Sequence, residues 1–426
     1  MSMQQAVRQM PVQTGRAGEM RGEAAHAPVS DEVCGPRHEI GNTGSALLEA
    51  ALTRENLKQA LRRVRRNKGA AGVDGLDIDQ TARHLVTAWP GIREQLLKGT
   101  YRPSPVRRLT IPKPDGGERE LGIPTVTDRL IQQALLQVLK PILDPTFSAH
   151  SYGFRPGRRA YDAVLAAQSY IQSGRRIVVD VDLEKFFDRV NHDILIDRLQ
   201  NRVEDAGIIR LIRAYLNSGI MDGGVVQQRE QGTPQGGPLS PLLANVLLDE
   251  VDRELARRGH CFARYADDAN VYVRSRRAGE RVMALLRSLY GRLRLTVNET
   301  KSAVASAFGR KFLGYSFWVA PGGMIKRGVA AKPLLAFKHR IRELTRRSGG
   351  RSMRDVVERL RPYLLGWVVA NAPCLASAGR MVPTSVACDS TQAVASWLDE
   401  LPGIVRLGRL AAGSTESGGQ QYFVVA

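Results

Sequence analysis

Two adjacent carboxylates lie between two apolar runs, and this pattern constrains the fold more than any other in the chain. The runs are residues 261–264 and 269–273, and Tyr265-Ala266-Asp267-Asp268 joins them. Such apolar runs around a short polar link predict two strands of a hairpin. Adjacent carboxylates repel each other, and Mg²⁺, which prefers oxygen ligands, relieves that repulsion. A solvated turn between two edge strands is the competing interpretation, because tetrapeptide motifs recur by chance.

A second carboxylate-bearing strand is predicted over residues 177–183. Strand side chains alternate between faces, so the apolar residues share one face while Asp180 and Asp182 share the other. The apolar face belongs against a core, which directs the carboxylates into a cleft. An edge strand with one wet face is the alternative. If this strand neighbours the hairpin in one sheet, the carboxylates form a site for two Mg²⁺ ions, which suits in-line phosphoryl transfer.

Cations for a triphosphate are offered by a predicted β-hairpin over residues 106–123. Lys113 and Arg119 flank its Pro-Asp-Gly-Gly turn, one on each arm. Lysine is a point charge and arginine a fork, and both suit phosphate oxygens. A solvated basic face is the alternative interpretation.

The charge balance favours a polyanionic partner. The chain of 426 residues has 62 Lys+Arg against 42 Asp+Glu, a net charge of +20, which favours nucleic acid, with an anionic membrane surface as the weaker alternative. It has no run of about 18 apolar residues and no apolar signal core, so we expect no membrane span and no secretion. The scattered cysteines form no CxxC pair, which argues against zinc or a disulfide framework and favours a cytoplasmic location.

Helical periodicity and strand runs together predict an α+β core with a helical appendage. Helices are expected over residues 49–67, 78–98, 128–143, 160–172, 239–257, 278–293, 332–347 and 354–367, and further strands near residues 303 and 311–319.

These motifs together resemble the intron-encoded reverse transcriptases of bacterial group II introns, the maturase family. The resemblance runs from about Arg54 to Trp367 and includes Gly69-Ala70-Ala71-Gly72-Val73-Asp74-Gly75. The ordered boxes lie at residues 67–75, 111–117, 122–129, 151–157, 182–188, 231–241, 265–268, 295–301 and 312–315. The resemblance implies a right-hand polymerase with fingers, a palm with a mixed or antiparallel sheet, and a partial helical thumb.

The resemblance assigns roles to individual residues. Asp182 and Asp267 resemble the principal catalytic metal ligands, with Asp268 as the weaker third carboxylate, whereas Asp180 receives no role. Phe187, five residues after Asp182, resembles the aromatic that lies under the sugar and excludes a 2′-OH; core packing is the alternative. The remaining residues implied to contact the dNTP are Lys113, Arg119, Gln235, Gly236 and Lys301, and Arg155 is implied to steady the template or the palm.

The activity implied is RNA-directed DNA synthesis with two Mg²⁺ ions, an RNA template, a DNA primer and dNTPs. The family's second role is that of a maturase, in which the same basic surface binds the host intron RNA. The basic helices around residues 57–66 and 332–365 are the natural surface for it, with merely solvated faces as the alternative. RNA held through its phosphates binds less tightly as salt rises.

The chain departs from the family's pattern after Trp367. Residues 371–426 contain three Arg, no Lys and four acidic residues, a change typical of a frameshifted or replaced C-terminus. We therefore predict a disordered segment over 1–45, fingers and palm over 46–320, truncated thumb helices over 325–370 and a divergent tail over 371–426. No Cys/His cluster of an HNH endonuclease is present, so we expect no DNA cleavage by this chain.

Two other classes of function remain open. One is a non-catalytic RNA-binding splicing factor that keeps polymerase residues without using them, although the intact carboxylate set argues against it. The other is a related reverse transcriptase that serves a retron, a diversity-generating element or a CRISPR array. The Gly-Ala-Ala-Gly-Val-Asp-Gly and Phe-Arg-Pro-Gly boxes favour the intron lineage.

Overall fold

The computed structural model describes residues 45–112, 118–222, 224–227, 231–233, 236–346, 350 and 352–377, without the side chains of Arg119, Met353 and 368–377. Nearly all of the predicted segment 1–45 and most of the predicted tail lie outside these residues, so both remain predictions. None of the described helices combines the length and apolar character that a membrane span requires.

The predicted first helix is in fact two helices. α1 covers Ala46–Ala51 and α2 covers Arg54–Arg66. The prediction of one helix from residue 49 to 67 is therefore wrong at its start. Leu52 turns into the core, where it is 4% exposed, and Thr53 adopts an extended conformation that starts α2. The apolar stripe of α2 is confirmed, since Ala60 packs in a cluster with residues of α3 and α4.

α3, over Ile78–Lys98, has the predicted bounds because both of its ends are capped. The Asp77 side chain accepts hydrogen bonds from the backbone N–H of Asp79 at 2.9 Å and of Gln80 at 2.7 Å. Gly99, with φ of 70°, ends the helix in the left-handed conformation that glycine adopts without strain.

The predicted β-hairpin forms half of a four-stranded sheet. β1, over Val106–Pro112, pairs antiparallel with β2, over Glu118–Ile123, and Ile111 lies opposite Arg119. β4 (Ile220–Asp222) pairs parallel with β1, and β5 (Val225–Gln227) pairs antiparallel with β4, so this sheet is mixed, in the order β2-β1-β4-β5. The sequence patterns gave no prediction for β4 and β5, which are three residues each.

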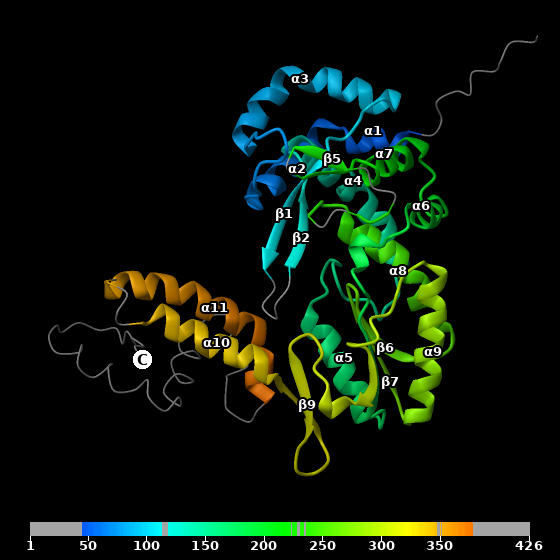
Figure 1. The fold of residues 1–426 in the computed structure, drawn as a ribbon, viewed down its shortest axis with the longest axis vertical. Coiled ribbons are helices and arrows are strands. Elements are labelled where there is room, and N and C mark those ends of the chain that lie inside the picture. Colours follow the sequence, from blue (N-terminus) through cyan, green and yellow to red (C-terminus); the bar gives the residue numbers. More distant parts are fainter. Residues whose placement is uncertain are drawn as a thin grey trace, which may run out of the picture. The chain divides into compact units, whose positions relative to one another are not determined.

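A second four-stranded sheet contains the carboxylate-bearing strands. Its order is β6-β7-β3-β8, and every neighbour in it is antiparallel. Figure 1 shows two of its strands, β6 and β7. The strands are β3 (Ile177–Val181), β6 (Cys261–Tyr265), β7 (Asp268–Val273) and β8 (Ala303–Ser306). β3 lies between β7 and β8, which excludes the edge-strand alternative. The predicted α+β class, with mixed and antiparallel sheets, is confirmed.

Helices cover both faces of this second sheet. α9 (Arg276–Arg292) packs on one face, where Val179 joins a large core with Val282 and Leu286. α5 (Ala160–Gln172) packs on the other face, where Val178 joins Ala167 in a separate core. Val178, on the same face as Asp180 and Asp182, is therefore covered by this helix. The sheet is buried on both sides at that end, whereas the Asp182 side chain beyond its other end is 42% exposed.

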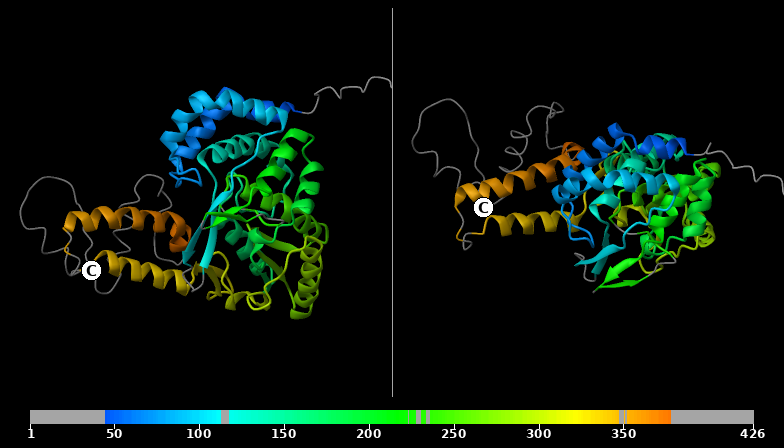
Figure 2. Two further views of the ribbon diagram at one scale, coloured as in Figure 1. Left: turned by 45° about the horizontal axis from the view of Figure 1, so that its top comes forward. Right: turned by 90° about the horizontal axis from the view of Figure 1, so that it is seen from above.

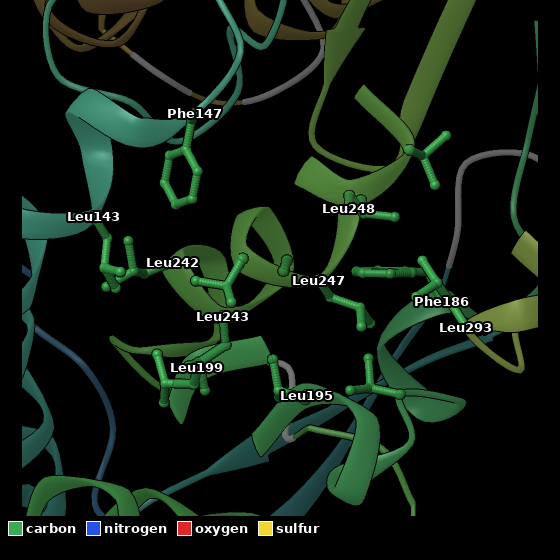
Figure 3. Packing of buried hydrophobic residues seen from close by; sticks show 14 of the residues in the cluster. Leu143, Phe147, Phe186, Leu195, Leu199, Leu242, Leu243, Leu247, Leu248 and Leu293 are labelled. Atoms are coloured by element: carbon green, nitrogen blue, oxygen red, sulfur yellow. The ribbon is translucent and has the colours of Figure 1, made fainter. Parts of the chain in front are cut away.

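The large core also includes the helices that follow the sheet strands. These are α4 (Val126–Leu143), α6 (His192–Gln200), α7 (Ala206–Leu216) and α8 (Ser240–Arg257). Figure 3 shows Leu195 and Leu199 of α6 on the same cluster as Leu243 and Leu247 of α8. Burying such side chains stabilises the fold by roughly 1.5–3 kcal/mol each before entropy is subtracted.

The C-terminal described elements are a strand hairpin and a helix pair. β9 (Tyr315–Val319) pairs antiparallel with β10 (Ile325–Val329). α10 (Ala331–Leu344) and α11 (Met353–Ser377) lie side by side (Figure 2). Phe337 of α10 stacks on Trp367 of α11 with ring centroids 4.0 Å apart. This pair forms its own small apolar cluster.

Candidate active site

The paired carboxylates lie at a two-residue hairpin turn. Tyr265 of β6 pairs with Asp268 of β7, which leaves Ala266 and Asp267 as the turn. Ala266 has a φ of 59°, whereas Asp267 does not have a positive φ. A positive φ at the first turn residue alone is the pattern of a type II′ turn, which normally has glycine there. Alanine in this conformation costs on the order of 1 kcal/mol, so the surroundings must hold it in place.

The register of β3 and β7 brings the second carboxylate to the same place. Asp180 lies opposite Asn270 and Val181 opposite Ala269, so Asp182 follows β3 at the level of Asp268. The predicted meeting of the two carboxylate strands in one sheet is therefore confirmed. Asp182 is held through its backbone: its N–H donates to Ser302 Oγ at 3.0 Å.

The electrostatics of Asp268 show how closely these groups gather. Burial raises the pKa of the Asp268 carboxyl to about 7, and the Asp180, Asp267 and Asp182 carboxylates add to the rise. Mutual repulsion of oxygen ligands is what a hard divalent cation offsets, so the donor set fits Mg²⁺ chemically. Among the described residues, no three acidic, histidine or cysteine side chains are already arranged to hold a metal ion.

Lys301 lies beside Asp182. Its Nζ is 3.5 Å from Asp182 Oδ2, and both side chains are accessible, at 63% and 42% exposed. Lys301 is thus within the carboxylate group, as its predicted place near a triphosphate requires. An accessible pair of this kind contributes little to stability.

Asp180 has a partner that the sequence did not identify. Arg310 donates from Nε to Asp180 Oδ2 at 2.7 Å and from Nη2 to the carbonyl of Lys301 at 2.6 Å. Burial raises the pKa of Asp180, and Arg310 opposes that rise. Asp180 therefore anchors the segment that presents Lys301, consistent with its lack of a predicted metal role.

Phe187 and Gly236 belong to two segments that pack on each other. Phe187 lies in the short 3-10 helix Phe186–Asp188, half-buried, with its ring edge-on to Phe186. Its carbonyl accepts a hydrogen bond of 2.7 Å from the N–H of Thr233. Gly236 has a φ of 136°, and a Cβ there would lie 2.6 Å from the carbonyl oxygen of Gly122. Gly236 thus allows its loop to touch the end of β2.

The other predicted dNTP contacts are not placed. Lys113 and Gln235 lie outside the described residues, and only the backbone of Arg119 is described, in β2. Their roles remain predictions.

Arg155 is buried and bonded within the protein, which favours the palm over the template among its two predicted roles. Its Nε donates to Asp144 Oδ1 at 3.0 Å and its Nη1 to the carbonyl of Ser148 at 2.7 Å.

Arg264 is a residue of this site that the sequence analysis did not identify. It is 1% exposed and bonded to Asp252, which is equally buried. An arginine inside an apolar strand directly before Tyr265 was the available signal, because a buried charge requires partners.

Two models of known protein families match this chain. A model of reverse transcriptase (RNA-dependent DNA polymerase) matches residues 111–317, and the group II intron maturase-specific domain matches residues 334–369. The chain belongs to the group II intron reverse transcriptase/maturase family. The maturase match favours the intron lineage over the other reverse transcriptases considered above.

Curated relatives are similar to this chain over part of their length. Protein YkfC of Escherichia coli (strain K12) is 36% identical over 218 residues, 50% of this chain and 57% of YkfC. Group II intron-encoded protein LtrA of Lactococcus lactis subsp. cremoris is 40% identical over 163 residues, 38% of this chain and 27% of LtrA. The chain thus matches less than two thirds of either relative. A solved partial Cas6-RT-Cas1--Cas2 complex has a TM-score of 0.38 and 26% identity, covering 57% of this chain and 42% of that one.

Proposed function

We propose that this chain is an RNA-directed DNA polymerase of the group II intron type. The observation that supports this most is the register that sets Asp182 beside Asp268 and the Asp267 turn. In the reaction, the primer 3′-hydroxyl oxygen attacks the α-phosphorus of a dNTP. A new P–O bond forms, the bond to the β-phosphate oxygen breaks, pyrophosphate leaves, and the hydroxyl proton passes to solvent.

Asp182 and Asp267 would hold the two Mg²⁺ ions of this family, with Asp268 in support. When bound, such ions activate the attacking oxygen and offset the charge of the leaving group. Lys301, next to Asp182, supplies a positive charge where the triphosphate would lie. Phe187, from the segment after Asp182, would pack under the sugar and exclude a 2′-OH.

RNA is the proposed template and, as intron RNA, the proposed partner in splicing. The net charge of +20 supports this. So does the solvent face of α2, whose exposed cations include Lys58, Arg62, Arg63, Arg65 and Arg66. Contacts of this kind read backbone and shape rather than base edges. Binding should therefore weaken steeply as salt rises.

Primer extension tests the proposal. Purified protein is given an RNA template, a DNA primer, Mg²⁺ and dNTPs, and wild type should extend the primer. Asp267→Asn should abolish extension and leave RNA affinity unchanged, since the substitution removes one charge at a turn. Asp79→Asn is the matched control, because Asp79 is exposed on α3 and forms an ion pair with Arg65 at 3.2 Å.

The outcomes separate this proposal from the non-catalytic alternative. Absence of extension by wild type, with help to intron splicing intact, would identify an RNA-binding splicing factor. Retained extension by Asp267→Asn would show that the metal ligands are misassigned.

A further inference from the structure

A buried arginine is bonded to the turn that carries Asp267. The Arg264 guanidinium uses all five of its N–H groups. Nε donates to the Asp252 carboxylate at 2.9 Å, and Nη2 donates to Asp252 Oδ2 at 2.6 Å and to Ser151 Oγ at 2.8 Å. Nη1 donates to Asn245 Oδ1 at 3.0 Å and to the carbonyl of Ala266 at 2.8 Å. A charge this buried is tolerated because every donor is satisfied.

The bond to Ala266 acts on the one peptide group that defines the turn. Type I′ and type II′ turns differ by a flip of the central peptide, which reverses its carbonyl and changes the sign of φ at the second turn residue. Here that carbonyl belongs to Ala266, and the second residue is Asp267. The Ala266 carbonyl accepts a hydrogen bond from Arg264, and this bond holds the carbonyl in one orientation. In that orientation the φ of Asp267 is not positive. The direction of the Asp267 carboxylate follows from that φ.

A second segment closes against the same turn. Ser151 forms a parallel bridge with Arg264, and the N–H of Tyr152 donates to the carbonyl of Arg264 at 2.8 Å. Gly153 follows, and a Cβ on it would lie 2.2 Å from the backbone nitrogen of Ala266. Only a glycine allows that approach. Asn245 of α8 joins the two sides, since its Nδ2 donates to the carbonyl of Gly153 at 2.9 Å.

We infer that Arg264, Asn245 and Gly153 are positioning residues that clamp the Ala266–Asp267 peptide and so aim the Asp267 carboxylate. The inference rests on the proposed function of the same site. The clamp explains how alanine is held in a strained turn conformation. It also gives a role beyond packing to the box at residues 151–157, because Gly153 within it touches the turn.

Three substitutions test the clamp. Gly153→Ala inserts a methyl group against the turn. Asn245→Ala removes the side chain that bonds both to the Gly153 carbonyl and to Arg264. Arg264→Lys keeps a positive charge beside Asp252 but lacks the guanidinium group that also bonds to the Ala266 carbonyl. Gly291→Ala is the control for the first, because a Cβ at Gly291 meets nothing within 4 Å. Arg202→Lys is the control for the last, because Arg202 pairs with buried Asp249 at 2.8 Å and not with the Ala266–Asp267 turn within the described part of the chain.

We expect kcat for single-nucleotide extension to fall about 10- to 100-fold in the clamp variants, while KM for the dNTP and RNA affinity stay within about twofold, as for a misplaced reacting group. Binding of Mn²⁺ to the free protein, followed by its electron paramagnetic resonance signal, should weaken in parallel. Both control variants should behave as wild type.

Two results would overturn the inference. One is wild-type kcat and Mn²⁺ affinity in Gly153→Ala and Asn245→Ala. The other is a loss of kcat, RNA affinity and melting temperature together in all three variants, which indicates only a packing role. If wild type itself extends no primer, the proposed function fails, and the Mn²⁺ signal still reports whether the clamp aims Asp267.

Discussion

Lys301 Nζ lies 3.5 Å from Asp182 Oδ2, so a cation of the chain itself stands beside the first predicted metal ligand. This places Lys301 to contact a triphosphate and also to compete with a metal ion for Asp182. Lys301→Ala should raise KM for the dNTP by up to about fivefold and lower the Mg²⁺ concentration for half-maximal extension, since an exposed pair is worth about 1 kcal/mol or less. Steady-state extension at varied dNTP and Mg²⁺ measures both.

Lys98→Ala is the matched control for that prediction. Lys98 is similarly exposed and also paired, with Glu94 at 2.6 Å, but it lies at the end of α3. An unchanged KM in Lys301→Ala would remove Lys301 from the site.

Phe187 should govern the choice between dNTPs and rNTPs. Its ring is half-buried, and its backbone is tied to Thr233, so the residue is well held. Phe187→Ala should reduce the preference for dNTP over rNTP by about 10- to 100-fold, the range expected for opening a steric contact. Competing incorporation of the two nucleotides measures it.

Phe308→Ala provides the comparison for Phe187, because Phe308 is a partly buried aromatic of the other core. Equal loss of discrimination in both variants, or none in Phe187→Ala, would mean that Phe187 is only packing.

Asp268 should make metal use depend on pH. Burial and neighbouring carboxylates raise its pKa to about 7. The ionised form binds a cation, and it is lost as pH falls through that value, so protons compete with the metal. From about pH 8 to about pH 6, the Mn²⁺ concentration for half-maximal binding should rise about tenfold, as one titrating group allows.

Asp268→Asn should remove the part of this pH dependence that comes from Asp268. Any pH dependence of Mn²⁺ binding that comes from other titrating groups should remain. The same tenfold change in Asp268→Asn would show that another group titrates.

Gly236 should tolerate no side chain. Its φ of 136° strains any other residue, and a Cβ would lie 2.6 Å from the carbonyl oxygen of Gly122. Gly236→Ala should raise KM for the dNTP by about tenfold, as about 1–2 kcal/mol of strain moves the loop from β2. Gly309→Ala, which meets nothing within 4 Å, should leave KM unchanged. A wild-type KM in Gly236→Ala would separate this loop from the nucleotide.

Local patterns predicted the elements whose signals lie within a few residues. α3 has a capping aspartate and a terminal glycine, and α5 has the predicted bounds as well. The two carboxylate strands are neighbours in one sheet, which is the condition that the sequence analysis set for Asp182 and Asp267 to meet. The sequence did not predict the break at Thr53, since burial of Leu52 by distant residues decides it.

Contacts between distant segments were the part that the sequence could not provide. Arg264 bonds to Ser151, 113 positions away, and Arg310 bonds to Asp180, 130 positions away. No periodicity encodes such pairs. A charged residue in an apolar strand indicates that a partner exists, but only the fold identifies the partner.

Single-nucleotide primer extension by wild type, Asp182→Asn and Asp193→Asn, with RNA affinity measured on the same preparations, is the most direct test of the catalytic assignment. Asp193 is a suitable control because it is exposed and forms an ion pair with Arg213 at 2.6 Å. We expect extension by wild type and Asp193→Asn, a loss of at least about 1000-fold in Asp182→Asn, and equal RNA affinity in all three. Extension by Asp182→Asn at the wild-type rate would contradict the assignment of this carboxylate to catalysis.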